Sequence, residues 1–156
     1  GYKINNKFIL SINFHDTIFS SSLRYSSKHD MRDIQHVLTY FNGNKQPDVC
    51  IVDAMEVAWE NGKETKAEND IMMVQFYKKG TTHITIKDQK LINRYNQYMG
   101  KRKQWLPPEY GSKAYSDLSP EVQDLVNEYE GVKSYAENLN DPLAIDNLSN
   151  SLLRLN

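Results

Sequence analysis

The chain has 156 residues, of which 39% are hydrophobic and 25% are charged, and its net charge at pH 7 is −1. This composition is typical of a folded globular protein and excludes an intrinsically disordered one. The length suits one domain over residues 1–156 with a sizeable buried core.

The sequence excludes several classes of protein. No apolar run approaches the ~18–20 residues that a membrane-spanning helix needs, and the N-terminal GYKINNKFIL lacks the order of a secretion signal. Cys50 is the only cysteine, so neither an internal disulfide nor a four-cysteine metal site can form. We therefore expect a cytoplasmic protein with no bound cofactor. Because the chain begins with Gly1 rather than Met, we expect a longer natural protein.

The N-terminal part predicts a strand, a loop and a helix. Apolar and polar residues alternate over Lys7–Phe14, which indicates a half-buried strand. The polar stretch Asp16–His29 predicts a loop. Asp30 is predicted to cap a helix that ends at Asn42-Gly43. Its apolar stripe consists of Ile34, Val37, Leu38 and Phe41.

The middle of the chain predicts a helix and then a β-hairpin. Asp48–Glu60 fits a strand or a helix. The helix is favoured by its composition and by the flanking Pro47 and Asn61-Gly62, which are typical of helix ends. Glu60–Asp70 predicts a charged loop. The runs Ile71–Tyr77 and Thr81–Ile86 flank the turn Lys78-Lys79-Gly80, which is typical of a hairpin.

The rest of the chain predicts helices. Asp88 opens a helix that runs to about Met99 and ends at Gly100, and the connection after it is extended. A helical extension is predicted from about residue 117 to residue 156, with starts at Ser119-Pro120 and Asp141-Pro142 and a short helix over Lys133–Leu139. The last apolar stripe either docks on the core or meets a partner helix. Its members are Ile145, Leu148, Leu152 and Leu155.

These elements predict an α+β fold. Its small antiparallel sheet would combine the N-terminal strand with the central hairpin, several helices would pack on it, and the C-terminal third would be helical.

The charge is polarised along the chain. Phe76–Trp105 holds eight basic residues and one acidic residue, so it carries +7. Residues 106–156 hold nine acidic and three basic residues, which makes −6.

The basic segment has two interpretations. It forms a surface that contacts DNA phosphates, with Tyr77, Tyr98 or Trp105 available to stack on bases, or it is a solvated face balanced by the acidic half. On the first interpretation the nucleic-acid-binding residues are Lys78, Lys79, Lys87, Arg94, Lys101, Arg102, Lys103 and Trp105.

No catalytic or metal-binding residues are predicted. His29, Asp30, Asp33 and His36 have ligand-like spacing, but solvated side chains near a helix start are the favoured interpretation. A nuclease would need carboxylates that meet only in the fold. The candidate members of such a catalytic cluster are Asp48, Asp53, Glu56 and His83.

Leu106-Pro107-Pro108-Glu109 superficially resembles the catalytic tetrapeptide of adenine-amino DNA methyltransferases. That motif needs Asp or Asn before the prolines and an aromatic residue directly after them. Leu106 and Glu109 occupy those places, and the chain lacks a glycine-rich turn for the methyl donor. The sequence therefore argues against methyltransferase activity.

FYKKGTTHITIKDQKLINRYN and the downstream WLPPEYGSKAYSDLSPEVQDLVNEYEGVKSY together resemble an uncharacterised domain of bacterial and phage proteins. The resemblance covers roughly Asp30–Tyr135 and is strongest over Phe76–Gly131. The matching positions are Phe76, Lys78, Gly80, His83, Ile86, Leu91, Asn96, Trp105, Leu106, Pro107, Gly111, Tyr115, Glu130 and Gly131. Lys79 and Thr81 depart from the pattern.

This family is often fused to adenine-specific DNA methyltransferase or helicase regions. The resemblance implies a phage or mobile-element setting and a role beside DNA modification, with DNA or an enzymatic domain as partner, but it supplies no catalytic residue. The alternatives are a protein–protein interaction domain and an undetected enzyme such as a nuclease. The oligomeric state stays open.

Overall fold

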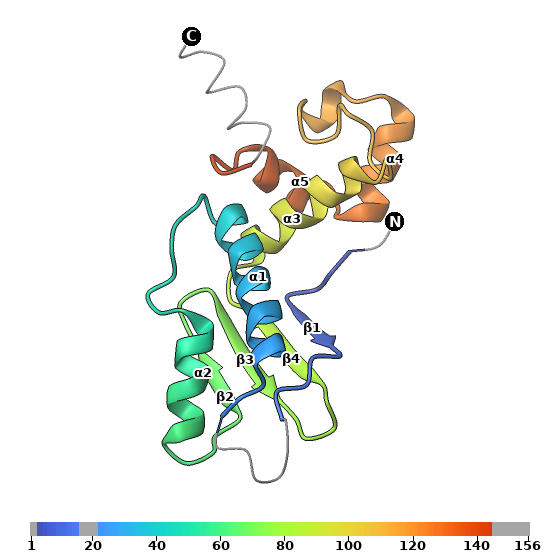
Figure 1. Cartoon of the computed structure of the whole chain (residues 1–156). Helices are drawn as coiled ribbons and strands as arrows, with labels where there is room; N and C mark the ends of the chain where they lie inside the picture. Colours follow the sequence, from blue (N-terminus) through green and yellow to red (C-terminus); the bar gives the residue numbers. More distant parts are fainter. Residues whose placement is uncertain (1–2, 16–21, 145–156) are drawn as a thin grey trace. The chain divides into compact units, whose positions relative to one another are not determined.

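A computed structural model of the protein describes residues 3–15 and 22–144 (Figure 1). Helices and one four-stranded antiparallel sheet are present within these ranges, which confirms the α+β class. The described residues form two compact units. We call residues 4–89 the sheet unit, and Lys3 with residues 90–144 the helical unit. The single domain that the sequence predicts stays a prediction.

The sheet unit contains all four strands, in the order β1-β4-β3-β2. They are β1 (Lys7–Leu10), β2 (Lys66–Glu68), β3 (Met72–Phe76) and β4 (Thr82–Ile86). The predicted hairpin is confirmed as β3 and β4, with Val74 opposite Ile84. Gly80 takes a φ of +84° in the turn, a conformation that glycine adopts without steric cost.

Helices α1 (Tyr25–Phe41) and α2 (Ile51–Glu60) pack over the sheet (Figure 1). Alternate residues of β3 and β4 are fully buried, and Met31, Leu38 and Met55 of the helices are buried with them. The predicted helix within Asp48–Glu60 is therefore confirmed, beginning at Ile51.

Helix α1 corrects two predictions. It begins at Tyr25, so Asp30 is exposed inside the helix rather than capping its start. Its buried side is also rotated from the predicted stripe, because Val37 is 45% exposed while Gln35 is buried. The Gln35 Oε1 atom accepts the backbone N–H of Ile51 at 2.7 Å and so satisfies a donor at the start of α2.

The strands at both edges of the sheet also differ from the prediction. β1 ends at Leu10 rather than Phe14, because Leu10 already pairs with Thr82, the first residue of β4. β2 lies within the segment predicted as a charged loop. Lys66 and Glu68 are exposed on either side of the half-buried Ala67, an arrangement suited to an edge strand.

The helical unit contains α3 (Gln89–Arg102, from Lys90 onward), α4 (Pro120–Tyr129), α5 (Val132–Leu139) and a 3-10 turn, η1 (Tyr115–Asp117). The predicted start of α4 and the predicted short helix are confirmed. Gly131 separates them with a φ of +81°. Gly100 lies inside α3 and does not end it. The predicted last stripe, Ile145–Leu155, lies outside the described residues.

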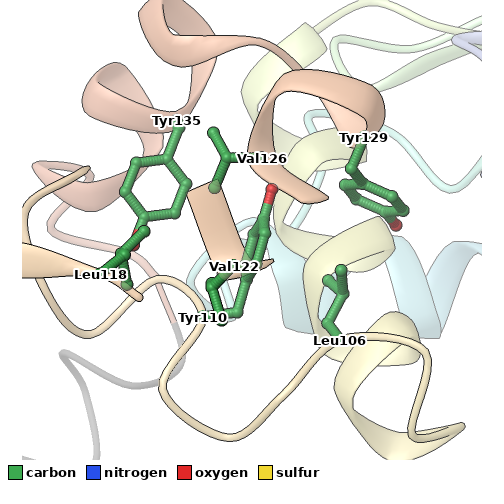
Figure 2. Close-up of a cluster of buried hydrophobic side chains, with 7 residues drawn as sticks. All are labelled: Leu106, Tyr110, Leu118, Val122, Val126, Tyr129 and Tyr135. Carbon is green, nitrogen blue, oxygen red and sulfur yellow. The ribbon is translucent and has the colours of Figure 1, made fainter. Parts of the chain in front are cut away.

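The core of the helical unit is rich in tyrosine. Figure 2 shows the rings of Tyr110, Tyr129 and Tyr135 among aliphatic side chains from the connection after α3 and from α4. The Tyr110 ring stands edge-on to both other rings, with centroids 5.2 Å from Tyr135 and 5.9 Å from Tyr129. The aliphatic members are Leu106, Leu118, Val122 and Val126.

Glu130 accepts hydrogen bonds for much of this core. The Tyr110 hydroxyl donates to its Oε1 at 2.6 Å, and the Gln97 amide donates to the same atom at 2.9 Å. Ser134 and Asn138 of α5 donate to Oε2. One carboxylate therefore links α3, the connection after it and α5.

Burial raises the pKa of the buried tyrosines. It raises the pKa of Tyr129 to about 12, and the nearby negative charge of Glu130 adds to the shift. Burial raises the pKa of Tyr110 still more, helped by its bond to Glu130, and also raises that of Tyr135. Above the unfolded tyrosine pKa of about 10 the unfolded chain releases protons that the native state keeps, so stability falls as pH rises.

We therefore predict unfolding in alkali that is coupled to tyrosine ionisation. On titration from pH 8 to 12, part of the rise in tyrosinate absorbance at 295 nm should come above about pH 11, beyond the ordinary tyrosine range, and coincide with loss of the circular dichroism of the helices. Tyr110→Phe should weaken the pH dependence of the free energy of unfolding, whereas Tyr40→Phe, which changes a half-exposed ring of α1, should not. Titration of all ten tyrosines near pH 10 with the helices intact would contradict this account.

Candidate nucleic-acid interface

The predicted nucleic-acid-binding residues fall into two groups. Lys78, Lys79 and Lys87 belong to the sheet unit, and the other five belong to the helical unit. One continuous hairpin–helix face therefore stays a prediction.

The hairpin turn presents two cations. Lys78 and Lys79 are exposed in the turn between β3 and β4, which is closed by a hydrogen bond from the Tyr77 N–H to the Thr81 carbonyl at 2.9 Å. Tyr77 is partly exposed, and its ring lies 4.7 Å from the His83 ring. The charge of Lys78 in this turn also acts on His15: burial lowers the pKa of His15, and the charge of Lys78 lowers it further. The turn is therefore a small basic surface with an aromatic side chain beside it.

Lys87 has a local partner. Its Nζ lies 2.9 Å from a carboxylate oxygen of Glu68 on β2. This hydrogen bond and the charge of Lys87 lower the pKa of Glu68. Both side chains are well exposed, so the pair is weak, but it offsets part of the positive charge at this point of the sheet.

Arg94 lies in the interior, which corrects its assignment to the binding surface. Its side chain is only 7% exposed, and Nε and Nη2 donate to the two carboxylate oxygens of Asp141 at 2.6 and 3.2 Å. This fork-like geometry is the strong form of an arginine–carboxylate pair. Arg94 therefore joins α3 to the segment after α5 and does not present its charge to a phosphate.

The remaining cations cluster where α3 ends. Lys101 is half-buried, and Arg102 and Lys103 are exposed. Backbone N–H groups of the residues that follow donate to carbonyls of the last helical turn. Those of Trp105 and Leu106 both donate to the Gly100 carbonyl, at 2.8 and 3.1 Å. The last carbonyls of the helix therefore do not need the basic side chains as hydrogen-bond donors. The partial negative charge at the C-terminal end of the helix in turn stabilises these cations.

Gly100 allows the chain to turn back in this way. A Cβ at this position would lie 2.6 Å from Cδ1 and 2.8 Å from Cγ of Leu106, closer than carbon atoms approach. Leu106 is buried in the core directly over Gly100, while its neighbour Trp105 stays 40% exposed. The reversal itself occurs at Gln104, which has a φ of +59°.

The reversed chain and the end of α3 line a shallow, open hollow of about 740 Å³. Its wall combines the Tyr98 ring, two basic side chains and two prolines, and Arg102 Nη1 donates to the Tyr98 hydroxyl at 3.3 Å. The lining residues are Tyr98, Lys101, Arg102, Gln104, Leu106, Pro107 and Pro108. A hollow with apolar surfaces and cations beside them can accept a ligand that is both flat and anionic.

The other candidate residues have local roles. Glu56 pairs with Lys28 at 2.6 Å. Asp48 and Asp70 each accept the other's backbone N–H, and the bond from Asp70 is the main cause of the lowered pKa of Asp48. Over residues 3–15 and 22–144, no three His, Cys, Asp or Glu side chains gather as metal ligands would. A bilayer-spanning segment is likewise absent from the described helices, which are too short or too polar.

Sequence reasoning identified the cations and Tyr98 but missed the hollow. Gln104, Pro107 and Pro108 line it because the chain reverses after α3, and the glycine that usually marks such a reversal is replaced by Gln104. The two prolines were a usable signal, since they exclude a continued helix and hold the backbone in a narrow range.

Comparison with known families matches residues 1–105 to the family described as Domain of unknown function (DUF4942). This agrees with the expected likeness to an uncharacterised domain. The match begins well before Asp30 and ends at Trp105, short of the predicted limit at Tyr135. No curated protein and no solved structure matches the chain significantly.

The position of Arg94 leads to a prediction about stability. Arg94→Gln should lower the free energy of unfolding by about 3 kcal/mol, because it leaves the Asp141 carboxylate buried without its cation. Urea unfolding followed by circular dichroism measures the loss. Arg102→Gln, a matched change at an exposed site of the same helix, should cost less than about 0.5 kcal/mol. Equal effects would contradict the interior role of Arg94.

The contact between Gly100 and Leu106 leads to a second prediction about stability. Gly100→Ala should destabilise the protein by about 1–2 kcal/mol, since crowding against Leu106 outweighs the gain of about 1 kcal/mol in helix propensity. In a Leu106→Ala background the same change should be neutral or stabilising. A double-mutant cycle by urea unfolding measures the coupling, and additive effects would show that the two residues do not constrain each other.

Proposed function

The chain belongs to the DUF4942 family of domains of unknown function, and we propose that it is a non-catalytic accessory module of a phage or mobile-element DNA-modification protein. In this role it contacts DNA, or a methyltransferase or helicase domain beside it, through basic residues of the hairpin turn and of the end of α3. The observation that carries the proposal is the cluster of Lys101, Arg102 and Lys103 beside an aromatic-lined hollow.

The charge distribution supports contact with a polyanion. Three successive cations follow one another at the end of α3, and Arg102 and Lys103 are exposed. Lys78 and Lys79 add a second exposed pair in the sheet unit. Each phosphate that such a side chain neutralises releases a counterion, so affinity for DNA would fall steeply with salt.

The local roles of the acidic residues support a binding role rather than a catalytic one. Asp141 and Glu130 are engaged by Arg94 and by Tyr110 and Gln97. Two of the three carboxylates predicted for a nuclease have structural partners, Lys28 for Glu56 and the backbone N–H groups of Val49 and Asp70 for Asp48. Binding therefore accounts for the described residues with fewer assumptions than hydrolysis does.

The test is a titration of labelled DNA with the full chain, followed by fluorescence anisotropy between 20 and 300 mM salt. Lys101→Glu/Arg102→Glu/Lys103→Glu should weaken binding about tenfold or more, and Lys78→Glu/Lys79→Glu should weaken it less. The neutral variant Lys101→Gln/Lys103→Gln should lower the slope of log affinity against log salt by about 1.4 on single strands or about 1.8 on duplex, if both lysines contact phosphates.

A matched control is Lys45→Glu/Lys66→Glu/Lys133→Glu, which changes the net charge similarly at exposed sites elsewhere. It should weaken binding clearly less than the reversal at α3. Equal effects of the two triple variants would show that binding depends on net charge alone. Absence of binding to any DNA at 20 mM salt would refute DNA contact.

A further inference from the structure

We infer that the hollow at the end of α3 binds single-stranded nucleic acid, with one unstacked base among Tyr98, Pro107 and Pro108 and the adjacent phosphates on Lys101 and Arg102. This inference rests on the proposed DNA contact and specifies the form of nucleic acid that the site takes.

The composition of the hollow carries the inference. Its lining includes one aromatic residue, Tyr98, two prolines, Pro107 and Pro108, and the buried Leu106. Cationic side chains stand beside these apolar surfaces rather than on a separate face. Single-strand binders combine the same two features, a positively charged path for the backbone and aromatic platforms for the bases.

A duplex would use only half of this arrangement. Its phosphates are accessible, but its base faces are stacked on one another and cannot enter a hollow without being unpaired. A site that only contacted duplex phosphates would need the cations and not the aromatic wall. The wall therefore favours a strand whose bases are already exposed.

The hollow is also organised before any ligand enters. Leu106 is fixed by its contact over Gly100, the prolines restrict the backbone, and the Arg102 guanidinium is held near the Tyr98 hydroxyl. Few rotamers would have to be ordered on binding, which lowers the entropic cost. The partly exposed Trp105 lies between two lining residues in the chain and is placed to report binding by its fluorescence.

A base with phosphates has two sources, a nucleic acid strand and a free nucleotide. The inference commits to the strand, because a run of three basic residues extends beyond the two cations that line the hollow. A nucleoside monophosphate offers one phosphate group to these cations, whereas a strand offers one phosphate per residue.

The experiment compares four ligands at equal ionic strength by anisotropy or competition: a 12-residue thymidine strand, its duplex with the complementary strand, an abasic strand of the same length, and thymidine monophosphate. The thymidine strand should bind at least about fivefold more tightly than the abasic strand, which has the same phosphates without bases. The mononucleotide should compete only at much higher concentration.

Tyr98→Ala should weaken binding of the thymidine strand about 5- to 100-fold and leave the abasic strand within about twofold. Tyr98→Phe keeps the ring and should retain most of the affinity. Tyr40→Ala, at an exposed tyrosine of the sheet unit, should have no effect. In a Trp59→Phe background, Trp105 is the only tryptophan, and its fluorescence should be quenched by the thymidine strand. Circular dichroism confirms that each variant is folded.

The outcomes separate this inference from the proposed function. Equal affinity for duplex and single strand, or a Tyr98→Ala loss that is the same on the abasic strand, would overturn the inference and leave DNA contact intact. Tight binding of the mononucleotide alone would replace the strand by a free nucleotide. Absence of binding to every nucleic acid at low salt would overturn both proposals.

Discussion

The helical unit depends on one close contact, the packing of Leu106 directly over Gly100. Because Gly100 has no side chain, the chain can reverse after α3 and place Leu106 in the core beside Tyr110 and Tyr129. The same reversal puts two prolines next to the end of α3. One missing Cβ therefore determines both how the tyrosine core closes and why a hollow forms outside it.

Charge serves two purposes in this unit, and burial distinguishes them. Arg94 and Asp141 lie in the interior, where their bidentate pair connects distant parts of the chain. Arg102 and Lys103, on the same helix or just past its end, are exposed. A count along the sequence gives these side chains equal weight, although only the exposed ones can meet a polyanion. The polarised charge is thus partly internal structure and partly surface.

Sequence patterns predicted the elements whose signals are local. The hairpin follows from the β-branched and aromatic residues that flank the turn at Gly80, and the start of α4 from Ser119 and Pro120. The start of α1 was not predictable in this way, because it has no capping side chain. The burial of Gln35 was not predictable either, because its hydrogen-bond partner, the Ile51 N–H, belongs to another helix. The cations of the candidate site were evident, but the hollow depends on Gln104 adopting a conformation that usually signals glycine.

The family match ends inside a folded unit, and this bears on how its function can be studied. It includes Tyr98, Lys101 and Gln104 but stops at Trp105, one residue before Leu106 covers Gly100. A fragment cut at that boundary would keep the cations of α3 and lose Leu106, both prolines and the helices that bury Tyr110 and Tyr135. Its α3 would expose the apolar side that normally packs in the core. The cations alone could still attract phosphates, but the hollow would not exist. Only a chain that continues through α5 can distinguish binding of bases from attraction to charge.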